Sequence, residues 1–128
     1  MSVDVKIKGL DEVLAHMENI NPRIDRELTS TMNQEGISWR DDVRANTPVD
    51  SGVLRGAMTF DGVNKTGSGF EMSLVNNTEY AQYVEYGHRT PGGKSTVKGV
   101  YMMKKGTVRL EKRLPDALER AMAKALEG

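Results

Sequence analysis

The sequence has no cysteine and few aromatic residues, with one tryptophan, two phenylalanines and four tyrosines among 128 residues. Without cysteine there is no disulfide framework and no thiolate chemistry, which is typical of proteins that work in the reducing interior of a cell. No apolar run approaches the roughly 20 residues that a bilayer span needs, and residues 1–8 lack the apolar stretch of a signal peptide. We therefore expect a soluble protein that is made in a cytoplasm and does not bind a membrane.

Residues that could carry catalysis or hold a metal are also scarce. The two histidines, His16 and His88, have no cysteine, second histidine or paired carboxylate at the spacing of metal ligands. The acidic pairs at 11–12 and 41–42 are adjacent in sequence, so on a helix their side chains point about 100° apart and do not form one acid and base site. A Gly-x-Ser-x-Gly nucleophile motif is absent as well. We predict no catalytic residue, no metal, no cofactor and no small-molecule substrate, and hence a protein that is not an enzyme.

The sequence Gly-Lys-Ser at residues 93–95 resembles the end of a phosphate-binding loop. That motif also needs a glycine five residues before Gly93, where His88 stands, and it must join a strand to a helix so that backbone N–H groups converge on the phosphates. We therefore interpret this stretch as a flexible basic loop and predict no nucleotide binding.

Net charge is zero but is unevenly distributed along the chain. Residues 1–85 hold 8 basic and 14 acidic side chains, whereas residues 86–128 hold 10 basic and 4 acidic ones. Such asymmetry predicts either an oriented surface with partners of opposite sign at its two ends or pairing between the two halves within one fold. The sequence leaves both interpretations open.

Hydrophobic periodicity predicts a strand and two helices in the first third of the chain. Apolar and charged residues alternate over residues 3–8, as in a half-buried strand, and residues 10–17 then follow a helical period. A long helix is predicted over residues 22–45, where apolar residues recur at three- and four-residue steps and only Gly36 weakens the run. Trp39 lies on this apolar stripe, so we expect it to anchor the core.

Two further strands are predicted over residues 54–60 and 70–75, joined through a polar link at 61–69 as an antiparallel hairpin. Residues 78–87 then predict a short helix, with Thr78 as its N-cap and Gly87 closing its last turn. At about 100° per residue, one side of this helix is aromatic and should dock, while the other is polar and should face solvent. The aromatic side carries Tyr80, Tyr83, Val84 and Gly87, and the polar side carries Glu79, Gln82 and Glu85.

Residues 88–100 have almost no apolar anchor and predict a long mobile loop. A C-terminal helix should follow from about Lys104, with Pro115 either kinking it or starting it. The order of elements predicts an α+β fold in a single domain over residues 1–128. We expect a small antiparallel sheet of three to four strands, packed against the long helix and the C-terminal helix.

Two segments together resemble the tail-component family of long-tailed bacteriophages: Thr-Pro-Val-Asp-Ser-Gly-Val-Leu-Arg at 47–55, and the stretch from Asn-Asn to Tyr-Val-Glu-Tyr-Gly at 76–87. The resemblance implies a structural virion protein of a phage or prophage, made in the bacterial host, that acts in tail completion or head-to-tail joining. It further implies a homo-oligomeric ring, a hexamer in the virion, at the neck between the capsid connector and the tail. Its partners would be neighbouring connector and tail proteins, with DNA passing through the channel. One departure from the family is His88, where many relatives have threonine.

Within the resemblance we interpret one group of residues as scaffold and another as surface. Turn chemistry explains the proline, aspartate and glycine of the first segment. The structural signature comprises Pro48, Asp50, Gly52, Glu85 and Gly87. The candidates for an interface or a channel lining are Arg89, Lys94, Lys98, Lys104, Lys105, Tyr80 and Tyr83. The alternative function is a small nucleic-acid-binding module that uses the basic segment 89–113.

Overall fold

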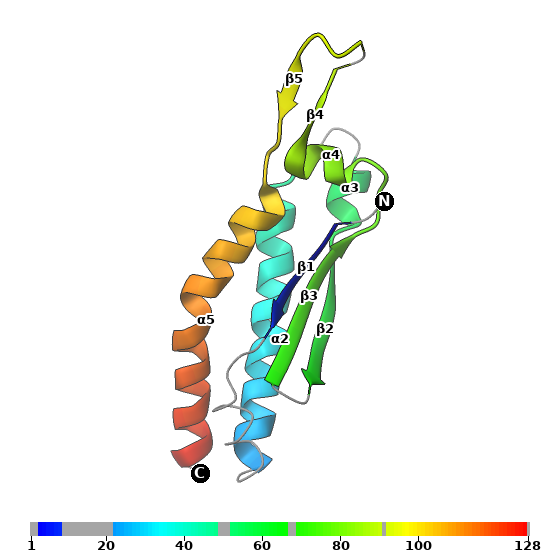
Figure 1. Cartoon of the computed structure of the whole chain (residues 1–128). Helices are drawn as coiled ribbons and strands as arrows, with labels where there is room; N and C mark the ends of the chain where they lie inside the picture. The colour runs from blue at the N-terminus through cyan, green and yellow to red at the C-terminus, as the bar shows by residue number, and fades with distance from the viewer. Residues whose placement is uncertain (1–2, 9–21, 49–51, 67–68, 91, 128) are drawn as a thin grey trace.

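The computed structural model describes residues 3–8, 22–48, 52–66, 69–90 and 92–127 (Figure 1). The helix expected over residues 10–17 lies outside the described residues, as do His16 and Asp50. The elements in chain order are β1 (Val3–Lys8), α2 (Pro22–Ala45), α3 (Val53–Gly56), β2 (Thr59–Thr66), β3 (Gly69–Asn76), α4 (Ala81–Tyr86), β4 (Gly87–Arg89), β5 (Thr96–Lys98) and α5 (Met102–Glu127).

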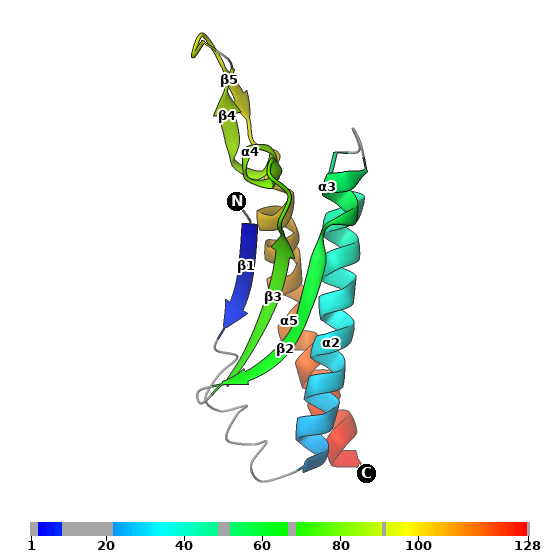
Figure 2. The ribbon, with the colours of Figure 1, turned by 90° about the vertical axis from the view of Figure 1, so that its right-hand side faces the viewer.

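The two long helices, α2 and α5, lie side by side and cover one face of a three-stranded antiparallel sheet (Figures 1 and 2). The strand order is β1-β3-β2, so the central strand β3 pairs with the first strand of the chain on one side and with its hairpin partner on the other. A register shift between Phe60 and Val63 bends β2, and Gly62 takes a φ of 90° there, as is common at a bulge. The predicted α+β fold with a small antiparallel sheet is confirmed.

Helix α2 is the spine that the periodicity predicts, with the same bounds and the same buried face. Trp39 is completely buried and meets the ring of Phe60 edge-on, with 6.4 Å between ring centroids. Gly36 lies on the same face, and a Cβ atom there would come within 2.0 Å of the Phe60 ring. The glycine that weakens the helical pattern therefore provides the space into which Phe60 of β2 packs.

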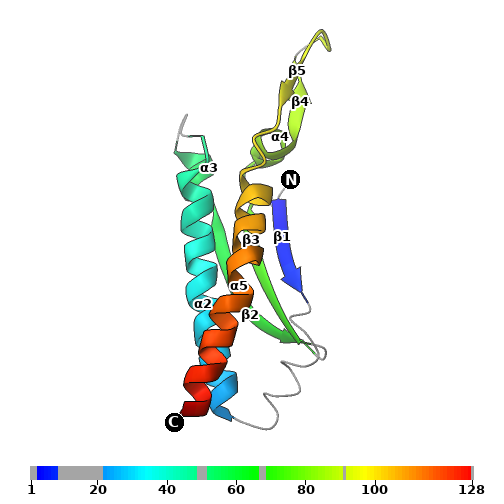
Figure 3. The ribbon, with the colours of Figure 1, turned by 90° about the vertical axis from the view of Figure 1, so that its left-hand side faces the viewer.

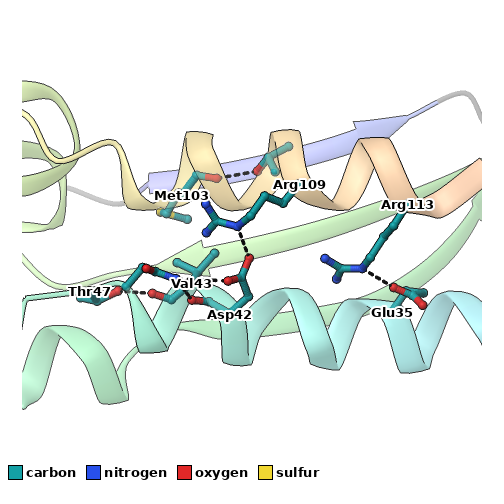
Figure 4. A network of polar contacts seen from close by, with 9 residues as sticks. Glu35, Asp42, Val43, Thr47, Met103, Arg109 and Arg113 are labelled. Carbon is teal, nitrogen blue, oxygen red and sulfur yellow. Dashed lines mark hydrogen bonds and ion pairs between the residues drawn. The ribbon is translucent and has the colours of Figure 1, made fainter.

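Helix α5 packs along α2 and is continuous from Met102 to Glu127 with Pro115 inside it, so the alternative that the helix starts at this proline is wrong. Gly106 allows the close approach of the two helices, because a Cβ atom there would lie 2.4 Å from Cγ2 of Val43. Three ion pairs also join the helices: Arg109 to Asp42 at 2.7 Å and Arg113 to Glu35 at 2.6 Å (Figure 4), and Lys124 to Glu27 at 3.7 Å.

The strand predicted over residues 54–60 is wrong in its first half. Residues Val53–Gly56 form the short helix α3, and the strand begins at Thr59 and continues through Thr66, into the stretch predicted as a polar link. Gly52, with a φ of 76°, opens this helical turn, and Arg44 of α2 holds its end by donating to the carbonyls of Met58 and Gly56. These tertiary contacts outweigh a weak alternation of apolar residues.

Residues 88–100, predicted as an irregular loop, contain a second antiparallel pair of strands. Gly87 pairs with Lys98, His88 with Val97 and Arg89 with Thr96. At the turn, Thr90 N–H donates to the Ser95 carbonyl at 2.9 Å. This hairpin projects beyond the rest of the fold (Figures 1 and 3). It has no buried face, so the period-2 signal that would identify strands in the sequence is missing; its mobility stays a prediction.

Candidate functional site

Helix α4 differs from its prediction in which side it buries. It begins at Ala81, and Thr78 is not its N-cap, since the Thr78 hydroxyl and N–H both donate to Oδ1 of Asn76 instead. Tyr80 and Tyr83, expected to dock, are 45% and 44% exposed, whereas Glu85, expected to face solvent, is 2% exposed. Tyr80 and Tyr83 are therefore surface residues and Glu85 is part of the interior, whereas Val84 packs against the core as predicted.

Glu85 is buried because its carboxylate caps another helix. One carboxylate oxygen accepts the N–H of Met103 at 2.8 Å and the other accepts the N–H of Lys104 at 3.0 Å. These N–H groups belong to the first turn of α5, which has no partner for them within the helix. Tyr101, the residue before α5, offers no side-chain oxygen at capping distance, so a negative charge from α4 satisfies the helix N-terminus. The contact fixes α4 to the start of α5.

The base of the hairpin is held by close contact between backbones at Gly87 and Gly99. A Cβ atom on Gly87 would lie 2.5 Å from the Val97 carbonyl oxygen, and one on Gly99 would lie 2.4 Å from that of Glu85. Gly87 has a φ of 87°, which also favours glycine. Two further hydrogen bonds close the base, from Val100 N–H to the Val84 carbonyl at 2.8 Å and from Tyr101 N–H to the Glu85 carbonyl at 3.0 Å. Helix α4, the hairpin and α5 therefore form one connected unit.

The two sequence segments singled out above meet in the structure through the buried side chain of Asn76. Its amide nitrogen donates to the Leu54 carbonyl of α3 at 2.8 Å, while its oxygen accepts from Thr78. Pro48 lies just after α2 and is exposed, and Arg55 Nε donates to the Arg44 carbonyl at 2.7 Å. The segments thus belong to one scaffold that orients the surface carried by α4 and the hairpin.

Most of the large apolar side chains that the described residues expose lie on or beside the unit formed by α4, the hairpin and α5. Three of the four tyrosines lie close to another ring or to a cation: the ring centroids of Tyr86 and Tyr101 are 6.3 Å apart, those of Tyr83 and His88 are 5.7 Å apart, and Nζ of Lys104 lies 5.6 Å from the Tyr101 ring centroid. We call this region the tyrosine face. Its exposed apolar members are Tyr80, Tyr83, Tyr86, Val97, Val100, Tyr101 and Val108.

Cations border the tyrosine face, and the described residues place no carboxylate within ion-pair distance of them. They are Arg89, Lys94, Lys98, Lys104 and Lys105, all exposed. The basic residues further along the chain differ, because Arg109 and Arg113 pair with α2 (Figure 4). Pairing between the two halves is therefore confirmed for Arg109 and Arg113, whereas an oriented surface with partners of opposite sign stays a prediction for the cations from Arg89 to Lys105.

Within the described ranges, no group of three or more histidine, aspartate or glutamate side chains could hold a metal ion. None of the helices described is both long enough and apolar enough to cross a membrane.

Comparison with known proteins identifies the family of the chain. The sequence pattern of the family described as "Bacteriophage HK97-gp10, putative tail-component" matches residues 11–87, more than half of the chain. The chain belongs to this family. This tail component is thus a structural phage protein that interacts with other virion proteins, as the sequence motifs predict. The comparisons with curated proteins and with solved structures gave no match. The matched range ends at Gly87, so the hairpin and α5 lie beyond it.

Proposed function

We propose that this tail component completes the tail at the neck of the virion, where copies assemble as a hexameric ring that joins the tail to the capsid connector. The proposal combines the family of the chain with one observation, the tyrosine face and the cations beside it, with which the described residues pair no carboxylate. Contiguous apolar surface of this kind marks a site that another molecule covers. In a ring of identical subunits, the part of this face on α4 and the hairpin is covered on every copy.

The outline of the subunit is compatible with a head-to-tail ring. Helix α4 and the hairpin lie on one flank, and α3 lies on the other (Figures 2 and 3). Helix α3 carries Val53, a further exposed apolar side chain. In a head-to-tail ring, one flank of each copy contacts the opposite flank of the next, so each apolar surface gains a partner.

The unpaired cations favour a second role for the hairpin, contact with DNA in the channel of the ring. Arg89, Lys94 and Lys98 lie on the projecting hairpin, and the described residues place no carboxylate beside them. Such cations suit the sequence-independent phosphate contacts that DNA passage requires. A nucleic-acid-binding module that uses the whole segment 89–113 is less well supported, because Arg109 and Arg113 are engaged by α2.

Complementation of the phage or prophage that encodes the chain tests the proposal. Without the protein, electron microscopy should show filled capsids and free tails; normal particles in its absence would contradict the proposal. A Tyr80→Ser and Tyr83→Ser double variant should abolish joining, whereas Leu126→Ser, on an exposed residue at the far end of α5, should not. Replacing Arg89, Lys94 and Lys98 with glutamine should spare joining and alter DNA retention if the hairpin lines the channel, and should abolish joining if it seals subunits. Neighbouring portal, capsid and tail-tube genes would add support.

A further inference from the structure

A groove on the first turns of α5 lies on the part of the tyrosine face that α4 and the hairpin do not carry. It has a volume of about 410 Å³ and is lined by Tyr101, Lys104, Lys105, Val108 and Arg109. These positions repeat at three and four residues, so they share one side of the helix. Tyr101 and Val108 are both more than one-third exposed, and they form an apolar floor between the charged side chains.

Two of the cations around this floor have contacts that hold them in place. Nζ of Lys104 lies 5.6 Å from the Tyr101 ring centroid, and the Arg109 guanidinium donates to Asp42 at 2.7 Å. The sequence has no acidic residue between Glu85 and Glu111, and the described residues pair no carboxylate with Lys104 or Lys105. An occupant that brings both apolar side chains and carboxylates would satisfy the floor and the rim together.

We propose that this groove binds an acidic, apolar segment of a different virion protein beside the ring. That the occupant belongs to the virion rests on the proposed function, while its chemistry rests on the groove alone. Duplex DNA fits less well, because phosphates gain nothing from Tyr101 and Val108.

A second copy of the chain also fits less well. Among the described residues, Leu126 next to Glu127 combines these groups but lies at the opposite end of α5 from the groove, and Ile37 lies one turn from Asp41, whose carboxylate Arg40 already engages at 3.0 Å. Neighbouring subunits in a ring contact each other at the same level along the ring axis, so the C-terminal end of α5 in one copy does not reach the groove of the next copy.

The test measures how tightly the protein binds a fluorescent peptide in which glutamate alternates with leucine. The same measurement is made with a peptide in which glutamine replaces glutamate and with a short DNA duplex. The purified full chain should bind the glutamate peptide and bind the glutamine version more weakly. Lys105→Glu and Val108→Ser, both at exposed positions, should weaken binding by about fivefold each, the effect expected for a partly exposed contact. Lys94→Glu matches the charge change at the hairpin tip, Leu126→Ser matches the apolar change at the far end of α5, and both should leave the affinity unchanged.

Four results would overturn the inference. The first is that the glutamate peptide does not bind, and the second is that Lys94→Glu loses as much affinity for the peptide as Lys105→Glu does. The third is that the DNA duplex binds through Lys105 while the peptide does not bind. The fourth is that the chain self-associates and that Val108→Ser or Leu126→Ser abolishes this association. The assay uses no phage particle, so its failure leaves the joining role intact. Conversely, normal particles without the protein would contradict the joining role and leave the groove chemistry standing.

Discussion

Replacing Glu85 with alanine should destabilise the fold strongly although the residue belongs to a short surface helix. The change leaves the N–H groups of Met103 and Lys104 without the carboxylate that lies 2.8 and 3.0 Å away. An unsatisfied buried donor costs about 1–3 kcal/mol, and loss of a helix cap costs about 0.5–2 kcal/mol. The Met103 N–H is buried and that of Lys104 is partly buried, so we expect a loss of about 3 kcal/mol. This is a large share of the roughly 5–15 kcal/mol typical of a domain.

Thermal unfolding and hydrogen exchange measure the effect. For a chain of this size, Glu85→Ala should lower the melting temperature by about 10 °C. Exchange should accelerate at the amides of Met103 and Lys104 before it does at the centre of α2. Glu85→Gln retains one acceptor and should lose about half as much stability. Glu79→Ala, at an exposed acidic residue of the same segment, is the matched control and should melt like the parent.

The reasoning fails if Glu85→Ala melts within a degree of the parent protein. It also fails if Glu85→Gln is the less stable of the two variants, because steric fit and not the carboxylate would then explain the burial. Equal destabilisation by Glu79→Ala would show that the acidity of the segment matters and not the cap.

Four further predictions concern the core, the base of the hairpin, the mobility of the hairpin and the Gly-Lys-Ser motif. Trp39→Ala should lower the free energy of unfolding by about 3–5 kcal/mol through lost packing, because the described residues offer the buried indole N–H no hydrogen-bond partner; an unchanged melting curve would refute this role in the core. Gly99→Ala should destabilise the hairpin base by about 1–3 kcal/mol in denaturant titrations, whereas Gly56→Ala, in open space, should be neutral or gain about 0.5 kcal/mol; equal effects would contradict the close-packing argument. Trypsin should cut the free protein in the hairpin long before α2, since a two-stranded hairpin without a buried face is marginally stable; equal protection would show that the hairpin is rigid. Lys94→Ala should leave the fold unchanged, and ATP binding that disappears in this variant would overturn the rejection of the Gly-Lys-Ser motif.

The fold could be predicted where one face of an element is buried. Helix α2 has the predicted bounds because a continuous apolar stripe meets α5 and the sheet. The prediction failed where tertiary hydrogen bonds, and not the burial of one face, determine the local secondary structure. Helix α3 depends on Arg44 and Asn76, and the hairpin depends on its backbone ladder, and neither leaves a periodic signal in the sequence.

The role of Glu85 could not be inferred from helical periodicity, which treats a carboxylate as a group for solvent. Its partner groups are backbone N–H donors 18 and 19 residues later, and these exist only once α5 has formed. One signal was available in the sequence: a helix beginning near Lys104 without a Ser, Thr, Asp or Asn just before it lacks a local cap. A helix N-terminus that lacks a local cap indicates that a residue distant in the sequence caps it.

The uneven charge along the chain divides in three dimensions into two groups with different consequences. Arg109, Arg113 and Lys124 lie beyond the hairpin and pair with acidic residues of α2, so their charge is used within the subunit. The cations from Arg89 to Lys105 have no such partners in the described structure and surround exposed tyrosines and valines. Because the Glu85 cap fixes α4 to the start of α5, Lys104 and Lys105 are held beside the tyrosines of α4 at one end of the helix pair. A surface that is held in this way, apolar and unpaired in charge, is suited to binding a neighbour with little loss of conformational entropy.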